Sequence, residues 1–184
     1  MKMDSLTPVI AFKHFKTVMT HKMYVFLFCK EAGIPWQGIK HDLSKFSPTE
    51  FIESVKYYTG TDSPINNCKK ANGYSEAWMH HKGRNKHHPA YWIDEFAPEP
   101  TPVIPYKYAV EMLCDKMSAA MTYKKDKFTT QYVLDYWNRE LPYENINPKT
   151  KKFITVVLEQ CVKNGIDKTF TKKNFKELYK KYCE

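Results

Sequence analysis

Histidine and aspartate residues occur in this chain in a pattern that could surround a metal ion. His41 is followed directly by Asp42, His21 lies upstream and Asp115 lies downstream. Imidazole nitrogens and carboxylate oxygens are common ligands of divalent first-row metals, and none of the five cysteines forms a CxxC pair that would offer thiolates instead. We therefore predict one metal site on four residues: His21, His41, Asp42 and Asp115.

Lys45 follows this pair at helical spacing, three residues after Asp42 and four after His41. Residues at these spacings share one side of a helix, so the ammonium group is expected beside the same ion. There it could neutralise negative charge that develops on a molecule bound to that ion. Asp42 and Lys45 are the predicted catalytic residues, whereas Ser44 lacks the base and orienting group that a serine nucleophile needs.

A second polar group lies in the nine-residue segment 80–88, which contains four histidines together with cationic and amide side chains. It can hold a second metal ion, or it can bind the phosphate oxygens of a substrate, to which Arg donates two hydrogen bonds. The alternative is a solvated polar helix end. The residues predicted for a second metal or for substrate binding are His80, His81, His87, His88, Lys82, Arg84 and Asn85.

Helical periodicity places two of the expected ligands on inward faces. His21 shares a face with Val18 and Val25, and Asp115 shares one with Met112. A carboxylate on such a face is unfavourable unless it is paired or bound to a metal. The alternatives are a core histidine at position 21 and an ion pair with a buried Lys or Arg at position 115.

Two further residues have roles that the sequence leaves open or assigns to packing. Glu111 lies one turn before Asp115, where it either assists the metal site or pairs with a structural lysine. His14 lies seven residues before His21 on the same helix, and we expect it to be a core residue.

Helix caps and breakers predict an all-α fold of seven to nine helices, with no sheet. Thr7-Pro8 begins a helix that runs to about residue 31, Ser47 to Glu50 form a capping box, and Ser75 caps a helix through about residue 86. Five prolines in residues 89–105 predict an extended loop. Helices are also expected over residues 36–46 (carrying the His-Asp pair), 64–72, 106–123, 128–139, 148–164 and 171–182.

Length and composition indicate one compact domain spanning residues 1–184 in a reducing cytoplasm. The cysteines are odd in number, no apolar run reaches membrane-spanning length, and residues 1–4 lack the apolar stretch of a signal peptide. The 29 basic and 20 acidic side chains give a net charge of +9, which favours anionic partners. Phosphorylated small molecules, nucleic acid and membrane surfaces all meet this criterion, and the charge alone does not separate them.

The order of His21, His41-Asp42 and Asp115 resembles the HD superfamily of metal-dependent phosphohydrolases. The resemblance implies a helical bundle, one or two divalent metals and hydrolysis of nucleotides or related phosphate esters. The HDxxK form of residues 41–45 resembles members with two metals, which place further histidines between the HD pair and the last Asp. In those members the middle histidines are spread over separate helices, whereas here they lie within nine residues.

The chain is most similar to a small bacterial and phage family without an assigned activity. The shared segments read HDLSKFSPTEF at residues 41–51 and HHKGRNKHH at residues 80–88, followed by Glu111-Met112 and Cys114-Asp115. This resemblance covers roughly residues 20 to 140, and it supplies no substrate.

The expected function is hydrolysis of a nucleotide, cyclic nucleotide or dinucleotide phosphoester with one or two divalent ions, among which Mn, Mg, Co, Ni, Zn and Fe are not distinguished. The expected partner is a phosphorylated small molecule, with nucleic acid as a further candidate and no membrane. Two alternatives remain open. A few HD-fold proteins, such as the myo-inositol oxygenase group, use a His-rich two-iron site for oxidation; alternatively, the chain binds nucleotides or nucleic acid without catalysis. The oligomeric state has no sequence signal.

Overall fold

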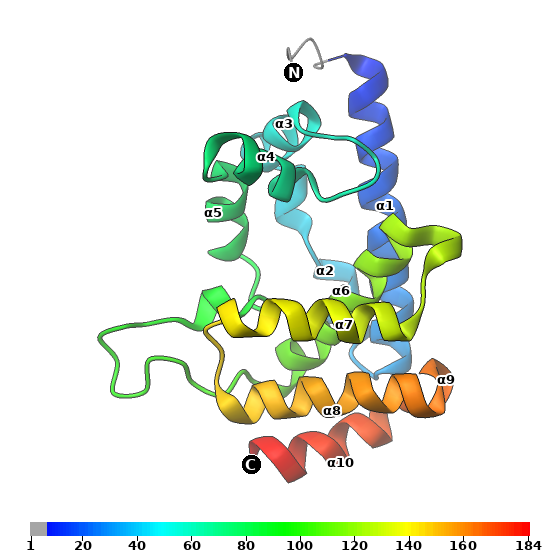
Figure 1. Ribbon diagram of the computed structural model, residues 1–184, viewed down its shortest axis with the longest axis vertical. Coiled ribbons are helices and arrows are strands. Elements are labelled where there is room, and N and C mark those ends of the chain that lie inside the picture. The colour runs from blue at the N-terminus through cyan, green and yellow to red at the C-terminus, as the bar shows by residue number, and fades with distance from the viewer. Residues whose placement is uncertain (1–6) are drawn as a thin grey trace.

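The computed structural model describes residues 7–184, which contain helices and no strands (Figure 1). The expectation about a signal peptide at residues 1–4 lies outside the described residues. Ten α-helices occur there, one more than the upper predicted number, because a four-residue helix precedes the last one. The α-helices are α1 (Pro8–Glu31), α2 (Pro35–Lys40), α3 (Pro48–Lys56), α4 (Pro64–Asn72), α5 (Glu76–Lys82), α6 (Tyr106–Lys124), α7 (Thr130–Glu140), α8 (Pro148–Asn164), α9 (Ile166–Thr169) and α10 (Lys172–Cys183).

Four short 3₁₀ helices complete the described chain: η1 (Leu43–Phe46), η2 (Pro89–Trp92), η3 (Lys125–Lys127) and η4 (Leu141–Tyr143). The predicted extended loop is present after η2 and projects to the left in Figure 1. No helix within residues 7–184 has both the length and the apolar character that a membrane crossing requires.

The long first helix forms as the sequence predicts. The Thr7 side chain accepts a hydrogen bond from the Ile10 N–H, and Pro8 occupies the first turn. His21 is buried on the same face as Val18 and Val25, and this face packs against α6. The inward position of His21 is therefore confirmed.

The main core lies where α6 meets α1 on one side and α7, α8 and α10 on the other. Leu113 of α6, Trp137 of α7 and Phe153 of α8 are fully buried there. Burying one such side chain contributes roughly 1.5–3 kcal/mol, so this cluster is the main source of stability. α8 lies beneath α7, with α10 below it (Figure 1).

The predicted helix over residues 36–46 is wrong, because α2 ends at Lys40 and a new 3₁₀ turn begins at Leu43. Between them Asp42 adopts a left-handed conformation with φ 54° and ψ 28°. Only Gly, Asn and Asp visit this region readily, so the break occurs at a residue type that tolerates it. His41 and Asp42 consequently lie in a sharp turn.

The helix predicted from Ser75 to about residue 86 is also too long, since α5 ends at Lys82. The His81 carbonyl accepts hydrogen bonds from the backbone N–H groups of Arg84 and Asn85 and from the Asn85 side chain. A side chain that binds a nearby carbonyl in this way competes with continuation of the helix. The chain therefore turns after α5 and brings residues 87 and 88 back toward His81.

Close contact between α1 and α2 depends on Gly38. A Cβ at this position would lie 2.7 Å from the Phe26 Cα and 3.0 Å from the Cys29 Cβ. Only a residue without a side chain permits this approach. The crossing fixes the start of the turn that carries His41 beside His21.

Candidate metal centre

Four side chains from three parts of the fold meet as predicted. His21 comes from α1, His41 and Asp42 come from the turn after α2, and Asp115 comes from α6. The His21 Nε2 lies 3.1 Å from the Asp115 Oδ1 and 3.3 Å from the His41 Nε2. The His41 Nε2 lies 3.2 Å from the Asp42 Oδ2. We call these four residues the first ligand group.

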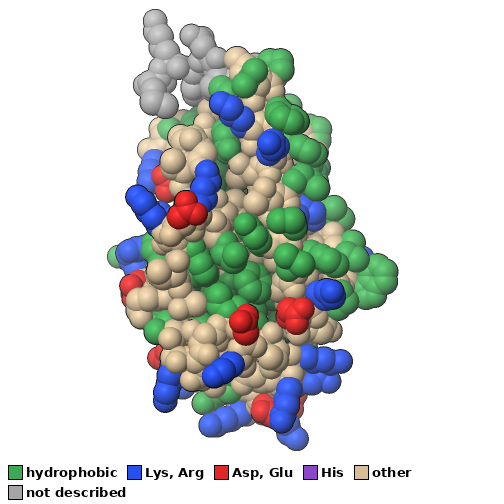
Figure 2. All heavy atoms as spheres, turned by 90° about the vertical axis from the view of Figure 1, so that its right-hand side faces the viewer, with side chains coloured by type: hydrophobic (Ala, Val, Ile, Leu, Met, Phe, Trp, Pro, Cys, Tyr) green, Lys and Arg blue, Asp and Glu red, His purple; other side chains and the backbone are tan. Residues whose placement is uncertain are grey.

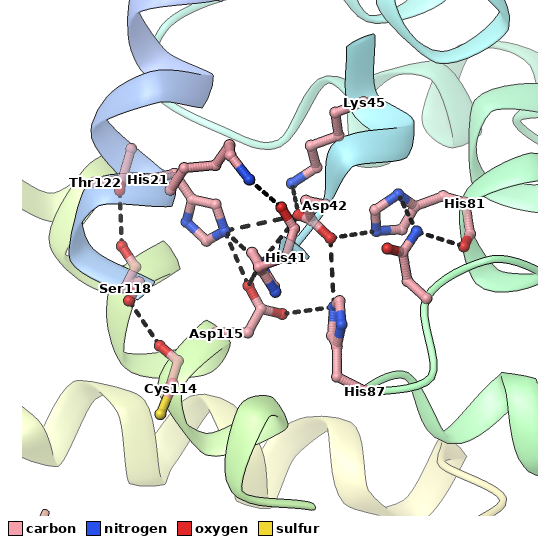
Figure 3. A network of polar contacts seen from close by, with 12 residues as sticks. His21, His41, Asp42, Lys45, His81, His87, Cys114, Asp115, Ser118 and Thr122 are labelled. Atoms are coloured by element: carbon pink, nitrogen blue, oxygen red, sulfur yellow. Dashed lines mark hydrogen bonds and ion pairs between the residues drawn. The ribbon is translucent and has the colours of Figure 1, made fainter. Parts of the chain in front are cut away.

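A second group of four lies on the other side of Asp42, and its other members are His81, His87 and His88. The Asp42 Oδ1 lies 3.4 Å from the His81 Nε2 and 3.5 Å from the His87 Nε2. The His81 and His88 Nε2 atoms are 2.9 Å apart. Figure 3 shows Asp42 between His21 and His41 on one side and His81 and His87 on the other. Asp42 thus offers one carboxylate oxygen to each group.

Glu111 orients one histidine of each group. Its Oε1 accepts hydrogen bonds from the Nδ1–H of His41 at 3.0 Å and of His87 at 3.2 Å. Its Oε2 accepts one from the Gln37 side chain at 2.6 Å. With this proton held on Nδ1, the Nε2 of each imidazole faces Asp42, and a metal ion bound there would take its lone pair. Glu111 therefore contacts a histidine of each group, and no lysine within residues 7–184 forms an ion pair with it.

Glu50 has the same role for His81. Its Oε2 accepts a hydrogen bond from the His81 Nδ1–H at 2.7 Å, and its Oε1 accepts one from His80 at 2.6 Å. The sequence assigned Glu50 to a capping box, but only half of that motif forms, namely the bond from the Glu50 N–H to Ser47 Oγ. The carboxylate turns inward to the histidines instead.

Electrostatics keep the carboxylates ionised. Burial raises the pKa of Asp42, but His41 and Lys45 outweigh it and hold the value well below the ordinary range. Burial also opposes ionisation of Asp115, whose pKa hydrogen bonds from His21 and His41 keep well below normal. His41 and His87 lower the pKa of Glu111 to about 2, again against burial. These residues are therefore anionic at neutral pH.

The histidines divide into two electrostatic classes. Burial lowers the pKa of His21, and burial together with neighbouring His87 and His81 lowers that of His88 well below normal, so both rings are neutral. Burial acts in the same direction on His41, but Asp42 dominates and raises the pKa well above its usual value. The carboxylates thus favour a positive charge beside the His41 ring, which a proton or a metal ion can supply.

The residues present fit a bound metal. The buried atoms Asp42 Oδ1 and His87 Nε2 have no hydrogen-bond partner, although they lie only 3.5 Å apart. Ligands bound at about 2.0–2.2 Å are separated by roughly 2.8–3.6 Å along the edges of a tetrahedron or octahedron. The 2.9–3.5 Å contacts described above match that spacing. A cation would satisfy both unpartnered atoms.

Lys45 contacts the shared carboxylate, as its spacing predicts. The Lys45 Nζ lies 2.6 Å from the Asp42 Oδ2. Four carboxylates (Asp42, Glu50, Glu111 and Asp115) contact the histidines, whereas two ammonium groups lie nearby, Lys45 on Asp42 and Lys22 on the His41 carbonyl. That excess of negative charge suits divalent cations.

Four predicted residues of segment 80–88 lie outside both ligand groups. The His80 Nδ1–H bonds to Glu50, and Arg84 is exposed and donates to the His80 carbonyl. Asn85 is buried, where its amide donates to Ser44 Oγ and stabilises the turn after α5. Lys82, like Arg84 and Asn85, does not line the cavity described next.

A cavity of about 390 Å³ opens onto both ligand groups, since His21, Asp42 and Asp115 line it together with His81 and His88. Its cationic side chains beyond Lys45 come from α4 and α6, and sequence reasoning missed them because no local pattern joins these helices. The lysines are Lys69, Lys116 and Lys124. Aromatic rings also line the cavity, among them Trp78, Tyr123, Tyr132 and Tyr136.

His14, expected in the core, is buried and also lines the cavity. Its ring packs against those of Phe51 and Tyr58, with centroids 5.2 and 5.4 Å away. Burial, followed by the charge of Lys45, lowers the His14 pKa to about 4.

The segment of the chain that matches a known protein family contains the whole candidate metal centre. No curated protein and no solved structure matches the chain. The family match covers residues 11–160, and both ligand groups lie within those limits. The chain therefore belongs to a family of unknown function (DUF5662).

Proposed function

We propose that this protein is a metal-dependent phosphoester hydrolase of the HD type. The observation that carries the proposal is the pair of ligand groups that share Asp42 and lie beside a cavity lined with lysines. The first group would hold one divalent ion, and His81, His87 and His88 with Asp42 would hold a second. Because imidazoles outnumber carboxylates, first-row transition metals fit better than Mg²⁺ or Ca²⁺.

A divalent ion bound at such a site lowers the pKa of a water ligand toward neutrality and acts as a Lewis acid on phosphate. The chain's own residues supply the rest. Glu111 and Glu50 hold three imidazoles in the tautomer that presents Nε2. Lys45 is held beside Asp42 with its side chain 27% exposed, so its ammonium can reach a phosphoryl oxygen and neutralise its charge.

The cavity supports a nucleotide-type substrate. Its volume of about 390 Å³ is in the range of small-molecule sites, and its lysines suit phosphate oxygens. Rings such as Trp78 and Tyr123 offer surfaces on which a base can stack. All five cysteines are free and buried, in keeping with the cytoplasmic location that we propose.

The test combines metal analysis with a phosphoester panel assayed with Mn, Mg, Co, Ni, Zn and Fe. Asp42→Asn is the sharpest variant, because Asn tolerates the left-handed backbone and removes only the charge. We expect loss of bound metal and of turnover with unchanged helical circular dichroism. Asp42→Ala should lose both as well, with additional backbone strain.

Lys45→Ala separates catalysis from metal binding. We expect it to retain metal and lose turnover, since the lysine touches Asp42 but is not a ligand. Lys70→Ala, which removes an exposed lysine of α4 outside the cavity, should leave both quantities unchanged. Full turnover in metal-stripped Asp42→Asn protein would refute the hydrolase proposal and favour a non-catalytic nucleotide binder.

The second candidate is a two-iron oxygenase, and the five imidazoles around two carboxylates favour it. Iron content with a visible chromophore, oxygen consumption and no cleavage of any phosphoester would select this candidate. Phosphoester cleavage by the zinc-loaded protein, with no iron present and no oxygen consumed, would exclude it, since Zn²⁺ has no redox chemistry.

A further inference from the structure

Helix α1 carries large apolar side chains on two opposite faces. One face, with Val18 and Val25, is buried against α6. On the other face large apolar residues recur every three or four positions and are 41–63% exposed. A surface helix ordinarily presents polar residues to solvent, so a second apolar face indicates a second packing partner. We call this face the α1 stripe: Val9, Phe12, Phe15, Met19, Met23 and Leu27.

Neighbouring elements extend the α1 stripe. The Phe15 and Phe46 rings lie 6.0 Å apart, which joins η1 to the stripe. Met19 and Met23 line a shallow groove together with Ile39 of α2, and Gly38 also lines it. Trp36 of α2 and Leu43 of η1 are 70% and 55% exposed. Figure 2 looks at the side of the molecule that carries α1 and shows hydrophobic side chains running along it.

The exposed apolar area is of the size that a stable interface needs. The ten residues of the α1 stripe and its extension are about half exposed on average. At roughly 200 Å² for each residue of this size, they offer on the order of 1,000 Å². The largest apolar patch of a typical monomer is about 300–600 Å², and a standard protein interface buries about 800 Å² per partner. This face is therefore large enough for one complete interface.

Two of the charges beside the stripe would pair with those of a second copy of the same chain, whereas Lys16 and Lys30 are further exposed cations of α1. Lys13 and Glu31 lie on the same flank of α1, 18 residues or about five helical turns apart. If two α1 helices pack antiparallel across position 22, Lys13 faces the partner's Glu31 at both ends. Lys22 itself donates to the carbonyls of Ile39 and His41, which directs its ammonium toward α2. Lys22 also lines the groove at Met19 and Met23, so in the dimer its ammonium stays bound to these carbonyls at the edge of the contact.

We propose that the α1 stripe, with its extension on α2 and η1, forms the interface of a symmetric, antiparallel homodimer. Self-complementarity of this kind is the defining property of a two-fold interface. The groove at Met19 and Met23 lies near the midpoint, where the two copies would insert their methionines. The proposal does not depend on the proposed hydrolase activity.

Sedimentation equilibrium and light scattering of the full chain test the proposal. The wild type should be a dimer at micromolar concentration. Met23→Asp should raise the dissociation constant at least about 100-fold, because each dimer loses two central apolar side chains and gains two buried charges. Phe96→Asp is the matched control, since Phe96 is 98% exposed and the loop after η2 that carries it lies away from α1 (Figure 1). The dissociation constant of this variant should equal that of the wild type.

A charge exchange tests the antiparallel arrangement. Lys13→Glu and Glu31→Lys should each weaken the dimer, by about 3- to 10-fold, and the double exchange should restore it. Helical circular dichroism should be the same for all variants, since every substituted residue is exposed.

Three results would overturn the proposal. The first is a wild type that stays monomeric at about 100 µM. If that monomer binds vesicles of anionic lipid, the α1 stripe contacts a membrane surface instead. The second is a dimer that Met23→Asp does not weaken. The third is a double exchange whose effects simply add, which would refute the antiparallel pairing.

Discussion

Replacing Glu111 is the most informative perturbation of the centre, because this residue touches a ligand of each group without belonging to either four-residue group. Its Oε1 accepts from His41 and His87, and its Oε2 accepts from Gln37. Loss of such an orienting partner typically lowers metal affinity 10- to 100-fold. In free energy that is about 1.4–2.8 kcal/mol.

Two substitutions of Glu111 should lower metal affinity to different extents. Glu111→Gln keeps an oxygen that can accept from both rings but removes the negative charge, and the Gln37 amide must rotate to pair with the new NH₂ group. We expect roughly a 10-fold loss of affinity. Glu111→Ala removes the acceptor as well, so both imidazoles are free to rotate, and we expect a loss of about 100-fold.

The assay is competition of metal-stripped protein with a chromophoric chelator, with circular dichroism as the check on folding. Glu140→Gln is the matched control, because Glu140 also lines the cavity but contacts Lys116, at 3.9 Å, and Tyr136 rather than a histidine of either group. It should bind metal as the wild type does. Unchanged affinity in both Glu111 variants would refute the orienting role, as would an equal loss in Glu140→Gln.

Three further predictions concern packing, pH and metal removal. Gly38→Ala should lower the free energy of unfolding in urea by about 1–3 kcal/mol, since the new Cβ would lie 2.7 Å from the Phe26 backbone. Gly83→Ala is the control and should be neutral, because its nearest contact would be at 3.6 Å. Equal losses in the two variants would contradict this account. The pKa of His14 falls from 6.5 to about 4 on folding, so stability should decrease by roughly 3 kcal/mol as the pH falls through that window. His14→Phe should show a correspondingly smaller pH dependence, and an unaltered one would exclude His14 as its source. Metal at about 100 times its dissociation constant should raise the free energy of unfolding by about 2.7 kcal/mol, which corresponds to roughly 5–10 °C in Tm. Thermal scans with and without chelator measure this shift, and Asp42→Asn should not show it.

Sequence periodicity located the ligands that lie on long helices. His21 and Asp115 each sit on a helix of about five turns or more, where apolar neighbours at helical spacing define the inward face. The turn at His41-Asp42 could not be predicted, because a left-handed conformation at a residue other than glycine has no local signal. Lys45 reaches Asp42 nonetheless, since a 3₁₀ turn also brings residues at i and i+3 together.

Residues whose roles depend on tertiary contacts were harder to identify. Glu50 is a plausible capping residue in sequence, and only the approach of α5 to α3 shows that its carboxylate binds His81. The same limit applies within segment 80–88. The helix end at Lys82, which the Asn85 amide helps to form, determines that His87 and His88 turn inward while Arg84 faces solvent.

The energetics of this centre argue for a cation in its own right. Asp42, Glu50 and Glu111 are each no more than 5% exposed, and apolar residues of similar volume would stabilise a purely structural core at least as well as a buried charged network. Hydrogen bonds from histidines satisfy most of their oxygens, yet the Asp42 Oδ1 and the facing Nε2 of His87 have no partner. Two unpartnered buried atoms at the junction of two ligand groups destabilise the fold unless something binds there. A divalent ion would offset that loss and the excess negative charge together, so metal binding should stabilise this protein whether or not it is a hydrolase as we propose.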